Sequence, residues 1–148
     1  MNFISKDLAR YAAYPCVEAF QVDLRRYHWP LLPVKRINGK YRYAFPDAVL
    51  AHVISVLRHL GISASSIASI LNRVDQTAFK QALDKFEADL VEDLILTLPV
   101  SQYFEPDDEG NLATVHTSIA SANETLNIMD AVFIRLTDIA LSIRDGHI

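Results

Sequence analysis

The sequence predicts a mainly α-helical fold with one β-hairpin, on three observations. Asn38-Gly39 separates two short strand-forming runs, and this dipeptide is the strongest short-range signal for a two-residue hairpin turn. On both sides of the hairpin, apolar residues recur at the three- and four-residue spacing of a helix face. In the last third of the chain this spacing continues without interruption, which predicts one long helix.

The hairpin covers residues 34–43 and leads directly into two predicted helices. Pro46 suits the first turn of the first helix, which is expected to end at Gly61. Ser63 is a good N-cap for the second helix, over residues 64–71.

Two further helices are predicted before the hairpin, over residues 4–13 and 17–28. The outward polar residues of the second helix are Glu18, Gln21, Asp23 and Arg25. Its glutamine and arginine suit the edges of bases, whereas its two acids are unfavourable beside phosphates. Trp29, in the apolar connection that follows, is expected to be a core residue.

Charge is distributed unevenly along the 148-residue chain, whose net charge is −4. Residues 1–60 hold nine Lys and Arg against four acids, whereas residues 61–148 hold five against fourteen. No acid occurs between Leu24 and Pro46, the segment that contains the hairpin. Such asymmetry is typical of a basic binding face joined to an acidic remainder. A basic hairpin that leads into a helix pair predicts a winged helix-turn-helix whose wing lays cations along DNA phosphates.

Several short motifs occur in a characteristic order. They are Ile4-Ser5-Lys6-Asp7-Leu8-Ala9, Leu31-Leu32-Pro33, Arg-Ile-Asn-Gly-Lys-Tyr-Arg-Tyr at 36–43, Arg-His-Leu-Gly-Ile-Ser at 58–63 and Ser-Ser-Ile-Ala-Ser-Ile-Leu at 65–71. In order and spacing they resemble the helix-turn-helix, the wing and the following helices of the MerR family of transcriptional regulators. The resemblance covers about the first half of the chain. It implies that residues 1–72 form a winged-helix DNA-binding domain with the helix over 17–28 as recognition helix.

The chain departs from the family pattern between the first two helices. It is several residues longer there, and Ala13-Tyr14-Pro15-Cys16-Val17 replaces the family's tight glycine-valine-serine turn. The family pattern therefore does not specify which residues of the recognition helix face the bases. The residues predicted to contact DNA are Gln21, Arg25, Arg26, Lys35, Arg36, Asn38, Gly39, Lys40, Tyr41 and Arg42.

Residues 73–148 are predicted to form a helical dimerisation region, with helices over about 76–98 and 112–144. The residues predicted to form the dimer interface are Ile119, Ala122, Leu126, Met129, Phe133, Leu136, Ala140 and Ile143. A C-terminal helix also forms the dimer in the family that the chain resembles. The expected fold class is therefore mainly α: a winged helix-turn-helix with one β-hairpin, followed by long dimerisation helices.

The sequence predicts no enzyme, no cofactor and no metal site. No phosphate-binding glycine loop and no Ser-His-Asp arrangement are legible, and the histidines have no ligand spacing with Cys16. Cys16 is expected to be buried filler, and a single cysteine suits a reducing cytoplasm. No apolar run is long enough to span a membrane.

The expected function is that of a dimeric, sequence-specific DNA-binding transcriptional regulator. Its expected partners are double-stranded DNA, a second copy of the chain and RNA polymerase. Other interpretations stay open. One is a winged-helix assembly protein, such as a phage small DNA-packaging subunit, or an interaction module that does not bind DNA. Another is a regulator that binds a small apolar ligand between the helices over 76–98 and 112–144.

Overall fold

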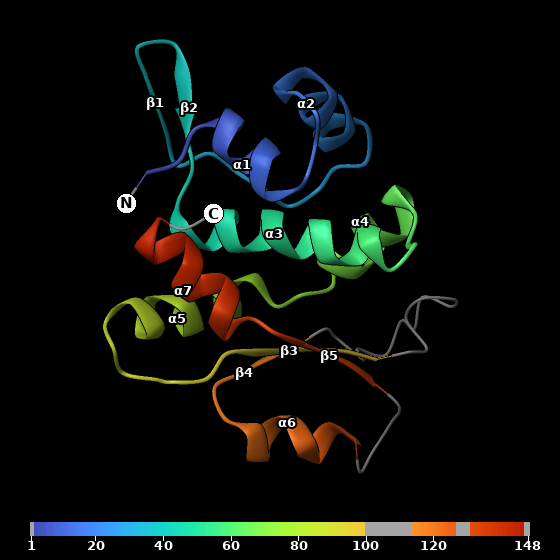
Figure 1. Ribbon diagram of the computed structural model, residues 1–148, viewed down its shortest axis with the longest axis vertical. Coiled ribbons are helices and arrows are strands. Elements are labelled where there is room, and N and C mark those ends of the chain that lie inside the picture. The colour runs from blue at the N-terminus through green and yellow to red at the C-terminus, as the bar shows by residue number, and fades with distance from the viewer. Residues whose placement is uncertain (1, 100–113, 127–130, 147–148) are drawn as a thin grey trace.

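The computed structural model describes residues 2–99, 114–126 and 131–146 (Figure 1). The first part contains α1 (Ser5–Tyr11), α2 (Val17–Arg26), β1 (Lys35–Ile37), β2 (Lys40–Arg42), α3 (Phe45–His59) and α4 (Ala64–Leu71). The remainder contains α5 (Gln76–Glu87), β3 (Ile95–Pro99), β4 (Thr114–His116), α6 (Ile119–Leu126), β5 (Ala131–Arg135) and α7 (Thr137–Asp145). The predicted mainly helical character with a small antiparallel hairpin is confirmed, and the arrangement is compatible with a winged helix-like fold.

Helix α3 is buried at the centre of the molecule, between the hairpin and the three-stranded sheet (Figure 1). It packs against α1, α4, α5 and α7. Its Leu50, Ile54 and Leu57 side chains are almost completely inaccessible to solvent. A helix that is apolar around most of its circumference is typical of a core position, so the other elements are organised around α3.

The local signals that follow α3 act as predicted. Gly61 has a positive φ of 82° directly after the end of α3, which a residue without a side chain adopts at little cost. The Ser63 hydroxyl accepts a hydrogen bond of 3.3 Å from the Ser66 backbone N–H. Helix α4 has the predicted bounds. Trp29 is buried, as expected, and its indole N–H donates to the Ala64 carbonyl over 3.3 Å.

The predicted helix over 76–98 is wrong in its second half. Helix α5 ends at Glu87, and Asp89 adopts a left-handed backbone with φ 56°. Strand β3 then begins at Ile95. The leucine spacing of the helix stripe continues through this turn, but Leu94 to Leu98 are all buried, as in a strand covered on both faces. A short apolar run of this kind fits a buried strand and a buried helix equally well.

The predicted single helix over 112–144 is also wrong. The described residues of that segment form β4, α6, β5 and α7 in succession. Helix α6 has its own start signal, because the Ser118 hydroxyl accepts a 3.1 Å hydrogen bond from the Ser121 backbone N–H. Both long helices on which the apolar-ligand interpretation was based are therefore replaced by a sheet with its helices.

The predicted dimer interface is divided among these shorter elements. Ala122, Leu136, Ala140 and Ile143 are buried inside one chain. Ile119 is exposed and Phe133 is half-buried. Met129 lies outside the described residues, as does the side chain of Leu126. Apolar spacing that was interpreted as an intermolecular seam thus serves the chain's own core.

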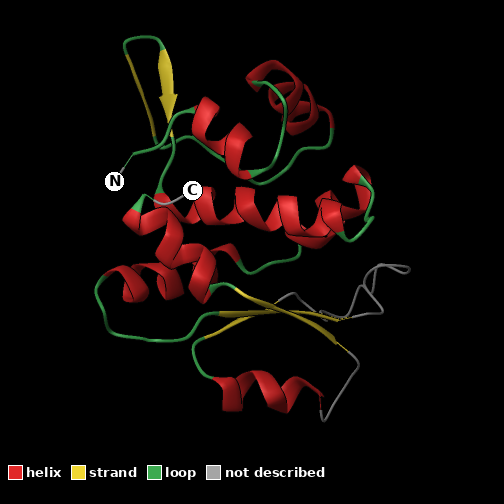
Figure 2. Cartoon of the chain, viewed as in Figure 1, coloured by secondary structure: helices red, strands yellow, loops and turns green. Residues whose placement is uncertain are grey.

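The three-stranded sheet has the order β4-β3-β5, with both pairs antiparallel (Figure 2). Ile95 of the central strand lies opposite His116 on one side and Arg135 on the other. Helix α6 covers one face, and α5 and α7 lie between the other face and α3 (Figure 1). No described helix has both the length and the apolar character that a membrane span requires.

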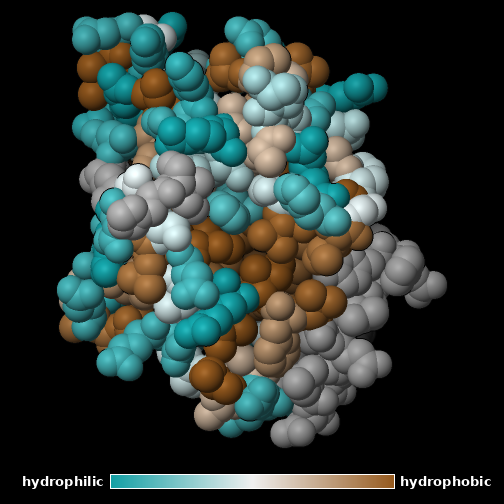
Figure 3. Space-filling view, in the orientation of Figure 1, coloured by the Kyte–Doolittle hydropathy of each residue, from teal (hydrophilic) through white to brown (hydrophobic). Residues whose placement is uncertain are grey.

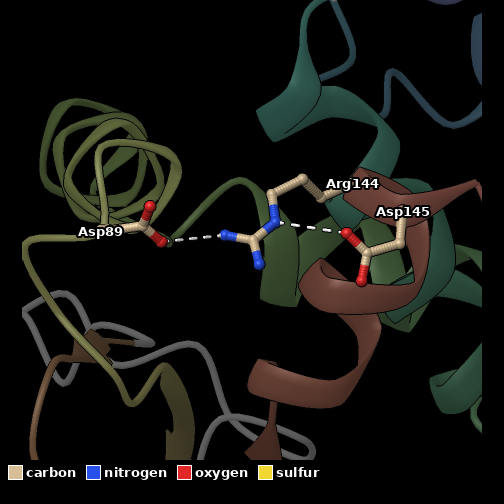
Figure 4. Close-up of polar contacts among 3 residues, drawn as sticks. All are labelled: Asp89, Arg144 and Asp145. Atoms are coloured by element: carbon tan, nitrogen blue, oxygen red, sulfur yellow. Dashed lines mark hydrogen bonds and ion pairs between the residues drawn. The ribbon is translucent and has the colours of Figure 1, made fainter.

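Helix α7 contacts the end of α5 through Arg144 (Figure 4). Its guanidinium lies 3.2 Å from the Asp89 carboxylate and 5.3 Å from the centroid of the Phe86 ring. The Asp89 side chain is 85% exposed, so the ion pair contributes at most about 1 kcal/mol. The burial of Ala140 and Ile143 is therefore the larger contribution to the packing of α7.

We expect Ile143→Ala to lower the free energy of unfolding by about 2–5 kcal/mol, because it leaves a cavity in the core of a single chain. Urea denaturation at two widely spaced protein concentrations measures this loss, which should be the same at both. Ile119→Ala is the matched control and should change stability by less than about 0.5 kcal/mol, because Ile119 is 56% exposed. A loss that disappears at high protein concentration would instead indicate an intermolecular seam.

Candidate nucleic-acid interface

The hairpin turn has the geometry that its sequence predicts. Asn38 and Gly39 both have positive φ, 51° and 78°. Two consecutive residues of positive φ form the tight turn that matches the twist of an antiparallel ribbon. The pairing of Arg36 with Tyr41 and of Ile37 with Lys40 follows from this two-residue turn.

One face of the hairpin carries a concentration of positive charge. Lys35 lies directly opposite Arg42, and Ile37 lies opposite Lys40, so these four residues share a face. Like charges in directly opposed positions are destabilising in a sheet. The hairpin itself contains no acid. Because Lys35, Lys40 and Arg42 have no carboxylate beside them in the ribbon, an external anion would relieve their mutual repulsion. We call these three residues the cationic face.

The opposite face of the hairpin holds Arg36 and Tyr41. The Arg36 guanidinium lies 5.3 Å from the centroid of the Tyr41 ring. This contact orients the arginine without neutralising its charge. Hydrophilic residues predominate over the hairpin in Figure 3. All residues from Lys35 to Tyr41 are exposed, so no described part of the acidic C-terminal half covers them.

Helix α2 has one exposed stripe, which consists of Glu18, Val22, Arg25 and Arg26. Phe20 is completely buried on the opposite side, where its ring lies 5.6 Å from that of Tyr14. Gln21 is half-buried, on the side of α2 that faces the hairpin tip.

A groove brings α2 and the hairpin together. It has a volume of about 360 Å³ and is lined by Ile4, Ser5, Lys6, Val17, Gln21, Gly39, Lys40 and Tyr41. Residues predicted to contact DNA from two separate elements, Gln21 and Lys40 among them, therefore share one concavity. Arg25 and Arg26 lie on the exposed stripe outside the residues that line the groove. Lys6, at the start of α1, is a groove cation that the sequence analysis did not single out.

The non-standard turn between α1 and α2 is an ordered element of the site. Arg58, near the end of α3, donates from Nη1 to the Ala12 carbonyl at 2.9 Å and to the Ala13 carbonyl at 3.3 Å. Its guanidinium also lies 4.1 Å from the centroid of the Tyr14 ring. Ala13 has φ 60°, a left-handed conformation that these contacts maintain. The turn thereby fixes the start of α2 relative to α3.

A residue of this turn also provides a hydrogen-bond partner for one of the two acids of α2. The Tyr14 hydroxyl donates a 2.6 Å hydrogen bond to the Asp23 carboxylate. Burial and this hydrogen bond raise the pKa of Tyr14 above its usual value, so the phenol stays protonated and keeps donating. Asp23 is therefore engaged within the protein, and Glu18 is the one acid on the exposed stripe.

The base of the hairpin is attached to the start of α3. Asp47, in the first turn of α3, is buried, and burial raises the pKa of its carboxyl to about 6. Hydrogen bonds from the backbone of Ala44 and Leu32 act in the opposite direction, as does the charge of Lys80. Leu32 precedes β1 and Ala44 follows β2, so one carboxyl group contacts both ends of the hairpin.

The N-terminal segment supports the hairpin from a second side. Phe3 and Tyr43 exchange two backbone hydrogen bonds of 2.9 Å and 2.7 Å. Both side chains are buried. The return strand is thus continued by a bridge to Phe3, two residues before the start of α1.

Cys16 is exposed, which corrects the expectation that it is buried. It occupies the N-cap position of α2 without a side-chain capping bond, next to Pro15 in the connecting turn. Apolar filler is therefore not its role. No group of three potential metal ligands occurs among residues 2–99, 114–126 and 131–146.

The structure shows two residues of the site that sequence reasoning missed: Arg58, which positions the turn before α2, and Val22, which lies on the exposed stripe. Arg58 was counted as one charge among nine in residues 1–60 and as part of the motif at 58–63, but its positioning role was not predicted, because its partners are carbonyl groups far away in the sequence. Val22 was not considered because apolar residues are usually assigned to a core face. A helical projection places Val22 between Glu18 and Arg25, and this was the available signal.

Comparison of the chain with protein-family models and with curated protein sequences finds no match. The function is therefore inferred from the geometry of the chain itself.

We expect stability to fall as the pH rises from about 4 to about 6. Over this range the native state keeps the Asp47 proton, whereas the unfolded chain, with a carboxyl pKa of 3.8, releases it. Asp47 therefore makes the free energy of unfolding higher below about pH 4 than above about pH 6, by about 3 kcal/mol. Above about pH 6 its contribution no longer changes with pH. Urea denaturation of the wild type and of Asp47→Asn at several pH values isolates the effect, because asparagine has no carboxyl group that titrates in this range. Parallel pH profiles for the two proteins would contradict the prediction.

Proposed function

We propose that this chain binds double-stranded DNA and acts as a transcriptional regulator, with α2 in the major groove and the hairpin along the phosphate backbone. The observation that carries the proposal is the groove in which Gln21 of α2 meets Gly39, Lys40 and Tyr41 of the hairpin. In such an arrangement one element contacts base edges while the other fixes its register on the phosphates.

The charges of the hairpin favour a polyanion over a small acidic ligand. The cationic face extends along both strands, and Arg36 adds a further cation on the other face. A DNA backbone presents a regular row of phosphates, and each one neutralised by Lys or Arg releases condensed counterions. The positive φ at Gly39 places a turn without a bulky side chain at the tip, where the backbone can approach a phosphate closely.

The order of elements also supports the proposal. Helices α1 and α2, the hairpin, α3 and α4 follow one another in the order that the resemblance to the MerR family implies. The longer turn between α1 and α2 is held by Arg58 and Tyr14, so the departure from the family pattern does not leave α2 unsupported. The proposal does not include the predicted helical dimer interface, since most of its described side chains are buried in one chain.

Molar mass distinguishes a regulator from the assembly-protein interpretation. A packaging subunit of a phage would form a large ring, whereas a regulator would be a monomer or a small oligomer. Light scattering on the purified chain measures this directly.

We expect Lys35→Ala/Arg42→Ala to weaken binding to all DNA sequences and to reduce the slope of log Kobs against log salt by about two units. Each substitution removes one cation from the phosphate-contacting face. Fluorescence anisotropy with a labelled duplex between about 50 and 200 mM salt measures the slope. Lys85→Ala, an exposed cation on α5, is the control and should leave the slope unchanged. Salt-insensitive binding by the wild type would remove the proposal.

We expect Gln21→Ala and Arg25→Ala to act differently from the hairpin variant. Each should reduce discrimination between a selected site and random DNA by about 1–3 kcal/mol, because base-edge contacts are lost. The measurement is selection of bound sequences from random duplexes, followed by affinities for the selected and the scrambled site. A uniform loss on both duplexes would place these residues on the phosphates instead.

A further inference from the structure

Val22 is an apolar side chain on an otherwise charged surface of α2. It is 50% exposed and lies between Glu18, one turn before it, and Arg25, one turn after it. A single exposed valine is ordinary on a protein surface. Its position is what distinguishes it, because it adjoins Gln21 of the groove, on the helix whose side chains are proposed to contact bases.

The chemistry of the major groove offers one apolar partner for such a residue. Guanine presents acceptors there, cytosine presents a donor, adenine presents one of each, and thymine adds a C5-methyl group. Arg25 and Gln21 have the donors that guanine and adenine require. Val22 can donate and accept nothing, so a methyl group is the base feature that it fits.

We infer that Val22 selects thymine at one position of the binding site, by packing against the C5-methyl group of that base. This inference rests on the proposed function and adds a specificity-determining residue to it. The spacing along the helix fits contacts on neighbouring base pairs. Three residues of helix rise by about 4.5 Å between Val22 and Arg25, and one base-pair step rises by about 3.4 Å.

The surroundings of Val22 keep this contact accessible. The neighbouring acid Asp23 is turned toward Tyr14, which donates to its carboxylate at 2.6 Å. Repulsion between that carboxylate and the DNA backbone is reduced, because the charge is hydrogen-bonded within the protein. Phe20 anchors the opposite side of α2 in the core, so the exposed stripe cannot rotate inward.

The test removes only the methyl group. A site selected from random duplexes is resynthesised with deoxyuridine in place of each thymidine in turn, and the affinity of the full chain is measured for each duplex. We expect one replacement to weaken binding of the wild type by about fourfold, the factor associated with burial of one methyl-sized group. We expect Val22→Ala, whose side chain is shorter by two methyl groups, to lose most of the difference between the thymidine and deoxyuridine duplexes at that position.

Val34→Ala is the matched control. Val34 is also exposed, at 58%, but it lies just before β1 and not on α2. This variant should keep the full deoxyuridine effect. Circular dichroism should show that both valine variants fold, since neither site is buried.

The outcomes separate the inference from the proposed function. Binding that is insensitive to every deoxyuridine replacement overturns the thymine contact and leaves DNA binding intact. The same holds if Val22→Ala keeps the full effect, because another residue would then contact the methyl group. Absence of binding to any duplex overturns the proposed function, and the inference with it.

Discussion

The burial of α3 is the constraint on which the rest of the structure depends. This helix has Asp47 in its first turn and Arg58 in its last. Asp47 accepts hydrogen bonds from the backbone on both sides of the hairpin. Arg58 donates to the carbonyl groups of the turn before α2. The two elements proposed to contact DNA are therefore both positioned by one core helix, one at each of its ends.

This arrangement explains how a longer turn is accommodated. The left-handed Ala13 would be strained in an unsupported loop. The Arg58 guanidinium satisfies two carbonyl groups there and lies over the Tyr14 ring. Tyr14 in turn donates to Asp23 of α2. A series of contacts thus runs from α3 through the turn to α2. The extra residues of the turn therefore hold α2 in one position relative to α3.

The parts of the fold that were predictable are those set by local stereochemistry. Asn38-Gly39 requires a turn with two positive φ values, and Ser63 and Gly61 mark helix ends wherever they stand in space. The C-terminal sheet was not predictable in this way. Leu94 to Leu98 are buried on both faces of a strand, so they lack the alternation that reveals a half-buried strand.

The candidate site divides along the same line. The hairpin cations were predictable because Asn-Gly fixes the register and the register fixes which residues share a face. The contact between Arg58 and Ala12 was not, because it joins residues far apart in sequence through a backbone carbonyl that any residue provides. The hydrogen bond from Tyr14 to Asp23 was not predictable for a similar reason. The turn residues that bring the two side chains together follow no helical or strand periodicity in the sequence.

In the proposed complex with DNA, the distribution of charge within the site would separate affinity from discrimination. The hairpin has cations without acids, so its proposed attraction to phosphates would depend on charge and would be the same for every DNA sequence. The exposed stripe of α2 is mixed, with an acid, an apolar residue and two arginines. A surface with mixed charges gains little binding free energy from phosphates. Its binding is weakened by any base that leaves a donor, an acceptor or a methyl group without a matching partner. An acid on the stripe is therefore compatible with the proposed DNA complex, because a carboxylate such as that of Glu18 can accept a hydrogen bond from the amino group of cytosine and would repel a misplaced phosphate backbone.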